Sequence, residues 1–242
     1  MDFSVLHNKF AKHDMIVFFD LEGTQINHKA IAIGLVAYKK KIGEIDFDID
    51  HPIKYFSLIK TDEPIGSVVQ QLTSITDKDI LERGKDIHNV VLDITKLLRP
   101  YKKCFISYGN LDILMLKNSL NFNDITESNF FRNVTKYYFD FHSYLMKRIV
   151  RDKGTAYSIA SLLSLYDIKV DGKLHDPLTD SISLALIYKN YINQFDKTLS
   201  LVMKNLKVAP IKNQVYASIY EYLEKNESID MDEAKEIVRK YL

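Results

Sequence analysis

Hydrophobic residues follow one another without interruption from Met15 to Phe19, a pattern typical of a strand buried on both faces. Residues 30–38 and 53–59 also have strand-like patterns. The connections between these segments are too short for helical crossovers. The pattern therefore predicts an antiparallel three-stranded meander at the start of the chain.

Beyond the meander the apolar positions change to helical spacing. Residues 86–98 have this spacing, and Pro100 ends the expected helix before a strand at 103–108. Further elements are expected as a helix at 111–120, a strand end and helix within 137–151, a helix at 155–166, and a helix from Asp176-Pro177 to about Tyr191. The order predicts an α/β fold with a mixed sheet and helices on both faces, similar to ribonuclease H-like domains.

The end of the chain has a purely helical pattern beyond Asn193. Asp230 with Glu233 three residues later resembles a capping box that opens a last helix reaching Leu242. We therefore expect one domain at residues 1–195 and a small C-terminal helical extension at 196–242.

Composition adds a few constraints. The 242 residues are 46% hydrophobic and 27% charged, and the net charge of +1 gives no global electrostatic case for nucleic-acid binding. The single cysteine, Cys104, excludes an internal disulfide and favours a reducing compartment. The first 14 residues lack a signal-peptide core, and no uncharged apolar run approaches the ~18 residues of a membrane span. We expect a cytoplasmic protein without a membrane segment.

Candidate chemistry begins at the end of the first strand. Asp20 and Glu22 are two residues apart, so both carboxylates project from the same face and can share ligands to a metal pair. The alternative is a polar strand end that faces solvent. An unpartnered acidic pair on a central strand would be costly, which favours a functional role.

Three further polar residues stand near predicted helix starts. Asp112 follows a strand and opens a helix, Asp180 lies in the first turns of the helix that starts at Pro177, and His175 lies just before that helix. Each has an ordinary alternative: the helix dipole favours an acid at either start, and His175 suits a polar loop. Taken singly, these alternatives stay open.

Together these segments resemble the DEDDh (DnaQ-like) family of 3′-5′ exonucleases over residues 14–192. DLEGT is similar to the first motif of the family, SYGNLDILML to the second and HDPLTDS to the third. The segment PIGSVVQQLTSITDKDI resembles the one that follows the meander in many members. The second motif is most similar to KapD-like and RNA-trimming exonucleases. Gly23 departs from a frequent Thr, and Asp176-Pro177 replaces a frequent Arg-Ala, which adds negative charge beside His175.

The resemblance implies a mechanism. Asp20, Glu22, Asp112 and Asp180 would hold two divalent ions, Mg²⁺ or Mn²⁺, and His175 would act as the base. The substrate would be the 3′ end of single-stranded RNA or DNA, with release of nucleoside 5′-monophosphates, and the sequence leaves RNA and DNA open. Homodimers occur among relatives, so a homodimer is compatible. Expected substrate contacts are Leu21, Gly23, Thr24, Leu72 and Ile75, with Tyr108 either stacking on a base or packing at a strand end.

One alternative belongs to another class, a catalytically silent relative that binds nucleic acid or a protein. The intact set of five residues argues against it. Of the basic runs, Lys39–Lys41 and Lys102–Lys103 are expected to be solvated faces. The run from Lys147 to Lys153 is a candidate phosphate track.

Overall fold

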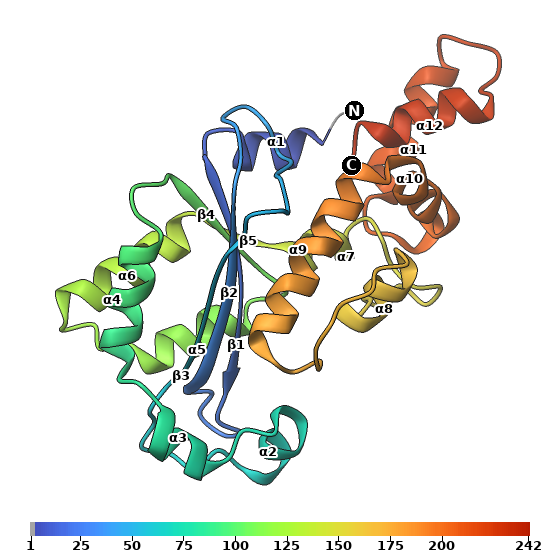
Figure 1. Ribbon diagram of the computed structural model, residues 1–242. Helices are drawn as coiled ribbons and strands as arrows, with labels where there is room; N and C mark the ends of the chain where they lie inside the picture. Colours follow the sequence, from blue (N-terminus) through green and yellow to red (C-terminus); the bar gives the residue numbers. More distant parts are fainter. Residues whose placement is uncertain (1–2) are drawn as a thin grey trace.

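One open sheet organises the computed structural model, which describes residues 3–242 (Figure 1). Within this range the strand order is β3-β2-β1-β4-β5. β1 pairs antiparallel with β2, and β2 with β3, so the predicted meander is confirmed. β4 pairs parallel with β1, and β5 with β4. The strands are β1 (Met15–Gly23), β2 (Ala30–Lys39), β3 (Ile53–Leu58), β4 (Lys103–Ser107) and β5 (Tyr138–Asp140).

Helices cover both faces of the sheet, as predicted (Figure 1). One face packs against α4 (Ile87–Leu97), α5 (Leu111–Ser119) and α6 (Ile125–Lys136). The other face packs against α1 (Ser4–Phe10), α7 (Phe141–Met146), α8 (Ile159–Leu165) and α9 (Pro177–Asn193). Two short helices follow β3: α3 (Asp77–Arg83) contacts β3, and α2 (Ser67–Thr73) lies beside Gln25 in the turn after β1.

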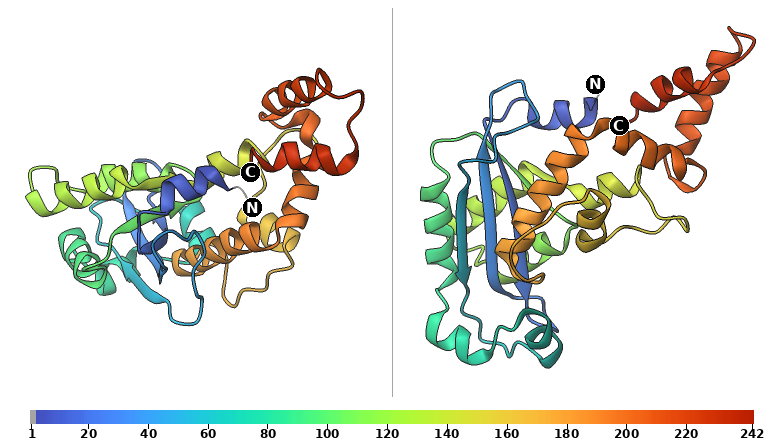
Figure 2. Two further views of the ribbon diagram at one scale, coloured as in Figure 1. Left: turned by 90° about the horizontal axis from the view of Figure 1, so that it is seen from above. Right: turned by 45° about the vertical axis from the view of Figure 1, so that its right-hand side comes forward.

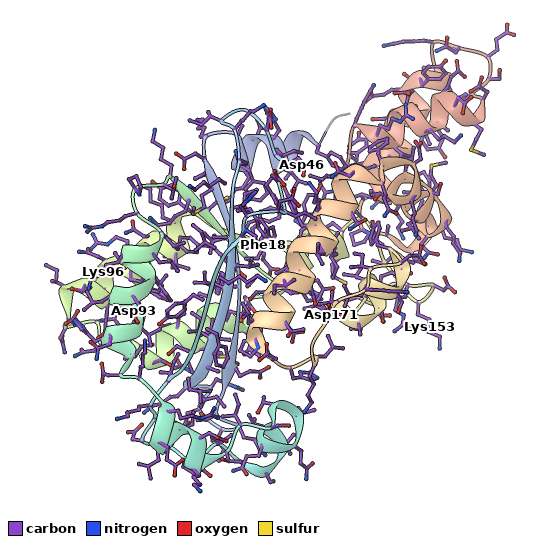
Figure 3. All side chains as sticks on the ribbon, viewed as in Figure 1. Phe18, Asp46, Asp93, Lys96, Lys153 and Asp171 are labelled. Atoms are coloured by element: carbon purple, nitrogen blue, oxygen red, sulfur yellow. The ribbon has the colours of Figure 1, made fainter. Side chains whose placement is uncertain are left out.

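β1 is the central strand, and its residues alternate between the two cores. Ile16 and Phe18 belong to the buried cluster on the α9 side, while Val17 and Phe19 belong to the cluster on the α4–α6 side. Figure 3 shows Phe18 beside α9, and its ring lies 5.5 Å from that of Tyr188 on this helix. Burial on both faces explains why the strand is hydrophobic at every position from Met15 to Phe19.

Local capping chemistry sets several helix boundaries. Asp176 accepts a hydrogen bond from the backbone of Thr179 at the start of α9, and Pro177 occupies the first helical turn, as expected from the sequence. α3 begins with a capping box between Thr76 and Asp79. The pattern did not predict four helices, namely α1, α2, α3 and α6.

The C-terminal part is helical, as predicted. It contains α10 (Phe195–Lys204), the 3₁₀ turn η1 (Leu206–Val208), α11 (Lys212–Leu223) and α12 (Met231–Arg239), and Figure 2 shows these helices projecting to one side of the sheet. The expected capping box of Asp230 and Glu233 opens α12. Leu199 and Val238 belong to the same buried cluster as Phe18, so this part shares a core with the sheet. The domain boundary at residue 195 stays a prediction. None of the described helices is long and apolar enough to cross a membrane.

Candidate active site

The alternation of β1 sets the direction of its two acidic side chains. Because Ile16 and Phe18 face α9, Asp20 and Glu22 continue on that side of the sheet. In the register of the sheet, Asp20 lies opposite Gly34 of β2, and the register shifts just after Glu22. The two carboxylates therefore face the start of α9, at the lower end of β1 in Figure 1.

Gly34 allows α9 to approach the sheet at this point. A Cβ atom at Gly34 would lie 2.2 Å from the backbone nitrogen of Leu178 and from the carbonyl carbon of Pro177. The Ser181 hydroxyl donates a hydrogen bond to the Gly34 carbonyl oxygen, at 2.9 Å. The first turn of α9 thus lies directly on the backbone of β2, beside Asp20. A larger residue in place of Gly34 would push this turn away from the carboxylates.

The first turn of α9 carries Asp180, which is 8% exposed. Its Oδ2 accepts a hydrogen bond from the backbone N–H of His175, at 3.0 Å. Its Oδ1 is buried and has no hydrogen-bond partner among the described residues. A buried carboxylate oxygen without a partner is costly, and a bound cation would satisfy it. His175 is exposed and has φ of 65°, a left-handed conformation, on the turn before the helix.

Asp112 reaches the site from the start of α5. The chain leaves β4, passes Gly109 with φ of 110°, and enters the helix at Leu111. Asp112 is buried, and its Oδ1 accepts a hydrogen bond from the backbone N–H of Leu21, at 2.8 Å. Leu21 stands between Asp20 and Glu22 on β1, so this hydrogen bond holds the second sequence segment against the first.

The three predicted segments therefore meet at one place. Ligand atoms of Glu22, His175 and Asp180 all lie within 4.8 Å of one another. Burial raises the pKa of Asp20 well above its ordinary value, and the charge of Asp112 adds to this effect. Among the described residues, no lysine or arginine forms an ion pair with these four carboxylates. Oxygen ligands of this kind suit Mg²⁺ or Mn²⁺, so the residues present fit the expected ions.

The pKa values of the other three carboxylates are also raised. Burial raises the pKa of Glu22 to about 8, and the charge of Asp180 raises it further. Burial raises the pKa of Asp112 to about 6, against the opposing hydrogen bond from the Leu21 N–H. Burial also raises the pKa of Asp180, although the N–H of His175 lowers it. Asp176 adds repulsion at Glu22, but its own Oδ1 is engaged in capping α9.

No protein-family model and no curated protein matches this chain. Among solved structures, the nuclease domain of 3′hExo, a DEDDh family member bound to rAMP, matches with a TM-score of 0.56 and 16% identity, covering 75% of this chain and 93% of that one. A full-length 3′-exonuclease matches with a TM-score of 0.57 and 16% identity, covering 76% and 62%. E. coli exonuclease I in complex with a dA16 oligonucleotide matches with a TM-score of 0.54 and 14% identity, covering 76% and 42%.

The chain has the fold of the DEDDh exonucleases. The predicted ribonuclease H-like mixed sheet is thereby confirmed. The matched part of this chain spans less than two thirds of the full-length 3′-exonuclease and of exonuclease I.

Within this DEDDh fold, the expected substrate contacts on β1 are enclosed. The backbone N–H of Leu21 is bonded to Asp112. Gly23 is buried, and a Cβ there would lie 3.0 Å from the Met115 side chain. Thr24 is also buried, and its hydroxyl accepts a hydrogen bond from the backbone of Lys29, at 3.0 Å. Contact of these residues with a substrate stays a prediction.

The other expected contacts lie on separate segments. Leu72 of α2 is 46% exposed, and Ile75 is half-buried just after that helix. Between them in sequence, Ser74 accepts a hydrogen bond from Lys173 Nζ, at 2.7 Å. This bond joins the Leu72–Ile75 segment to the loop that carries His175. Contact of Leu72 and Ile75 with a substrate stays a prediction.

Tyr108 has an internal partner. Its hydroxyl donates to the Tyr157 carbonyl, and its ring packs edge-on against His142 with centroids 5.0 Å apart. This geometry favours the packing alternative over stacking on a base. The candidate phosphate track also loses a member, because Arg148 is buried: it stacks on Tyr144 at 3.9 Å and donates from Nε to the Tyr241 carbonyl, at 2.8 Å.

Sequence reasoning missed Gly34 and Ser181, the two residues that seat α9 on the sheet. A signal for Gly34 was present, because an isolated glycine inside a strand pattern often marks a close backbone approach. Ser181 gave no such signal, since a serine one residue after Asp180 is ordinary on a helix.

Proposed function

We propose that this protein is a 3′-5′ exonuclease that hydrolyses phosphodiester bonds at the 3′ end of single-stranded RNA or DNA and releases nucleoside 5′-monophosphates. The observation that carries the proposal is the convergence of four carboxylates and one histidine at a single place in this fold: Asp20, Glu22, Asp112, Asp180 and His175. These residues come from three segments of the chain that are far apart in sequence.

The carboxylates are proposed to hold two divalent ions, Mg²⁺ or Mn²⁺. When bound, such ions supply a nucleophile at neutral pH and stabilise negative charge on the leaving oxygen. Asp180 offers its unpartnered Oδ1 to this role, while its Oδ2 holds the turn of His175. Asp112 uses Oδ1 to fix the backbone of β1, and its Oδ2 is proposed as a metal ligand.

His175 is proposed as the general base. It lies on an exposed turn, so its ring can reach both solvent and a phosphate held at the carboxylates. The bond from its backbone to Asp180 keeps the turn at the edge of the site. A residue that removes a proton from the attacking water has to be within hydrogen-bond reach of it, and this placement supports that role.

The substrate class is proposed from two matched structures. The nuclease domain of 3′hExo was solved with rAMP, and exonuclease I with dA16. Both ligands are adenine nucleotides with different sugars, so they support a nucleic-acid strand as substrate and leave RNA and DNA as alternatives. Leu72 and Ile75 are proposed to pack against the terminal base, and the backbone from Leu21 to Thr24 to approach its sugar.

The test uses matched single-stranded RNA and DNA oligonucleotides labelled at the 5′ end, with Mg²⁺, Mn²⁺ or EDTA. We expect a ladder that shortens from the 3′ end, depends on metal, is lost in Asp180→Asn and forms far more slowly in His175→Ala. Asp171→Asn is the matched control, because Asp171 is exposed on the same loop (Figure 3) and makes no ion pair among the described residues. A folded protein that leaves both oligonucleotides intact would refute the proposal.

A further inference from the structure

The fold gathers basic residues at the end of β1 that lies opposite the acidic site. The register pairs Met15 with Lys39 of β2 and with Lys103 of β4. Lys12 lies just before β1, and Lys102 just before β4. Basic runs expected to be separate solvated faces therefore meet at one end of the sheet, although the whole chain has a net charge of only +1.

A pocket of about 420 Å³ lies among these residues. Its walls combine lysines with aromatic rings and include Lys12, His13, Tyr101, Lys102, Lys103 and Tyr137. Phe105 and Asn133 complete the walls, which places the pocket toward α6 and away from the α9 face of the active site. It is therefore separate from the carboxylate site.

The lysines that line this pocket form no ion pairs within the described part of the chain. They are Lys12, Lys102 and Lys103, and among the described residues no carboxylate lines the pocket. Asp14 is the acidic group nearest in sequence. Burial and the charge of Arg99 lower the pKa of Lys103, while Asp14 opposes them. Lys40 is engaged elsewhere, since its Nζ donates to the backbone carbonyl of His13.

Lysine side chains lie over the aromatic rings of the pocket walls. Lys39 Nζ lies 4.8 Å from the centroid of the Tyr101 ring, and Lys136 Nζ lies 5.1 Å from that of Tyr137. The ring of His13 packs edge-on against Tyr137 with centroids 5.4 Å apart. The Nδ1 atom of His13 is buried and has no hydrogen-bond partner in the described part of the chain. Lysines between aromatic rings are suited to a ligand with both negative charge and a flat ring.

We propose that this pocket is a second binding site for a single-stranded nucleic acid, in which Lys12 and Lys102 contact phosphates and Tyr101 and Tyr137 contact a base. Binding here needs no metal and no cleavage. The inference rests on the proposed function in one respect: the strand bound at this pocket is taken to be the strand that the active site degrades.

The distance between the two sites determines which strands can occupy both. From Met15 to Asp20 the strand rises about 17 Å, the length of about five stacked nucleotides. The path from one face of the sheet to the other adds to this length. Oligonucleotides of three nucleotides or fewer are therefore too short to occupy both sites, whereas a strand of about 20 nucleotides is long enough.

The experiment measures fluorescence anisotropy of a labelled 20-nucleotide single strand in EDTA, so that catalysis does not contribute. The variant combines Lys12→Gln with Lys102→Gln, both exposed lysines. The control combines Lys207→Gln with Lys225→Gln, which removes the same charge from exposed positions on the C-terminal part. Losing two phosphate contacts lowers the magnitude of the slope of the logarithm of the binding constant against the logarithm of salt concentration by about 1.4. At 0.1 M salt this change corresponds to about 25-fold weaker binding. The control pair is expected to bind like the wild type.

Three outcomes would overturn the inference. The first is that the pocket variant binds the strand as tightly as the wild type does. The second is that the control pair loses as much affinity as the pocket variant. The third is that a strand of the same length without bases binds the wild type as tightly as the strand with bases. The last outcome would remove the role of Tyr101 and Tyr137. Failure of the proposed function is distinguishable, because a protein that cleaves nothing can still show this pattern of binding. If cleavage occurs, the pocket variant should raise KM for the 20-nucleotide strand and leave KM for a trinucleotide unchanged.

Discussion

Replacing Glu22 with Gln should stabilise the metal-free protein while it abolishes activity. Burial and the neighbouring carboxylates raise the pKa of Glu22 from 4.5 to about 8. The folded protein therefore binds a proton at neutral pH that the unfolded chain releases. Stability falls as pH rises between these two values, because the unfolded state binds fewer protons than the folded state. Glutamine does not ionise, so the folding free energy of the variant does not fall with pH at this position.

The magnitude follows from the interval between pH 4.5 and pH 7. At 1.36 kcal/mol for each pKa unit, the loss of folding free energy at pH 7 is about 3 kcal/mol at most. For a chain of this size each kcal/mol changes Tm by about 2 to 4 °C, so the expected gain in Tm is about 6 to 12 °C. The gain should vanish near pH 4.5 and reach its full value above pH 8.

The assay is thermal unfolding of wild type and Glu22→Gln in EDTA across pH 4.5 to 8.5, followed by the same comparison in Mg²⁺. Metal should reverse the order, because binding to the folded wild type stabilises it. Glu227→Gln serves as the control, since Glu227 is exposed and makes no ion pair among the described residues. A lower Tm for Glu22→Gln in EDTA at pH 7, or a difference that does not vary with pH, would refute the reasoning.

Three other predictions concern single residues. His175→Ala should slow single-turnover cleavage by about 100- to 10,000-fold while Mn²⁺ binding, followed by calorimetry, stays unchanged. Gly34→Ala should lower stability by about 1 to 3 kcal/mol and slow cleavage by about 100-fold, because its Cβ would move α9 away from the carboxylates; thermal unfolding and the oligonucleotide assay measure the two effects. Asp230→Ala should remove the cap of α12 and lower Tm by about 2 to 4 °C, with cleavage unchanged.

The spacing of hydrophobic residues and the capping residues within short segments predicted much of the fold. The apolar run of β1 and the capping residues of α9 are signals that a few adjacent residues carry, and both matched the structure. The missed helix α6 shows the opposite case. Its sequence contains β-branched and aromatic residues of modest helix propensity, and burial of Phe130 and Val134 in the core stabilises it. That contribution depends on contacts with distant residues.

The candidate site follows the same division. The spacing of Asp20 and Glu22 was enough to predict that both side chains lie on the same face of a strand. Their distance from Asp180 was not, since it depends on how closely α9 approaches the backbone at Gly34. The basic runs give the clearest difference. They were expected to be separate solvated faces, and only the sheet register places Lys39 and Lys103 on either side of Met15.

The alternation of β1 also determines which insertions and deletions the gene can tolerate. Adding or removing one residue between Met15 and Phe19 would turn Asp20 and Glu22 toward α4 and α6 and would exchange the two cores. Residues 41–44 and 48–51 of the connection from β2 to β3 are exposed, so length changes there leave the register intact, whereas Phe47 between them is buried in the core. Length variation among natural relatives should therefore concentrate in residues 41–44 and 48–51 and be absent from β1, even where the amino acids of β1 differ.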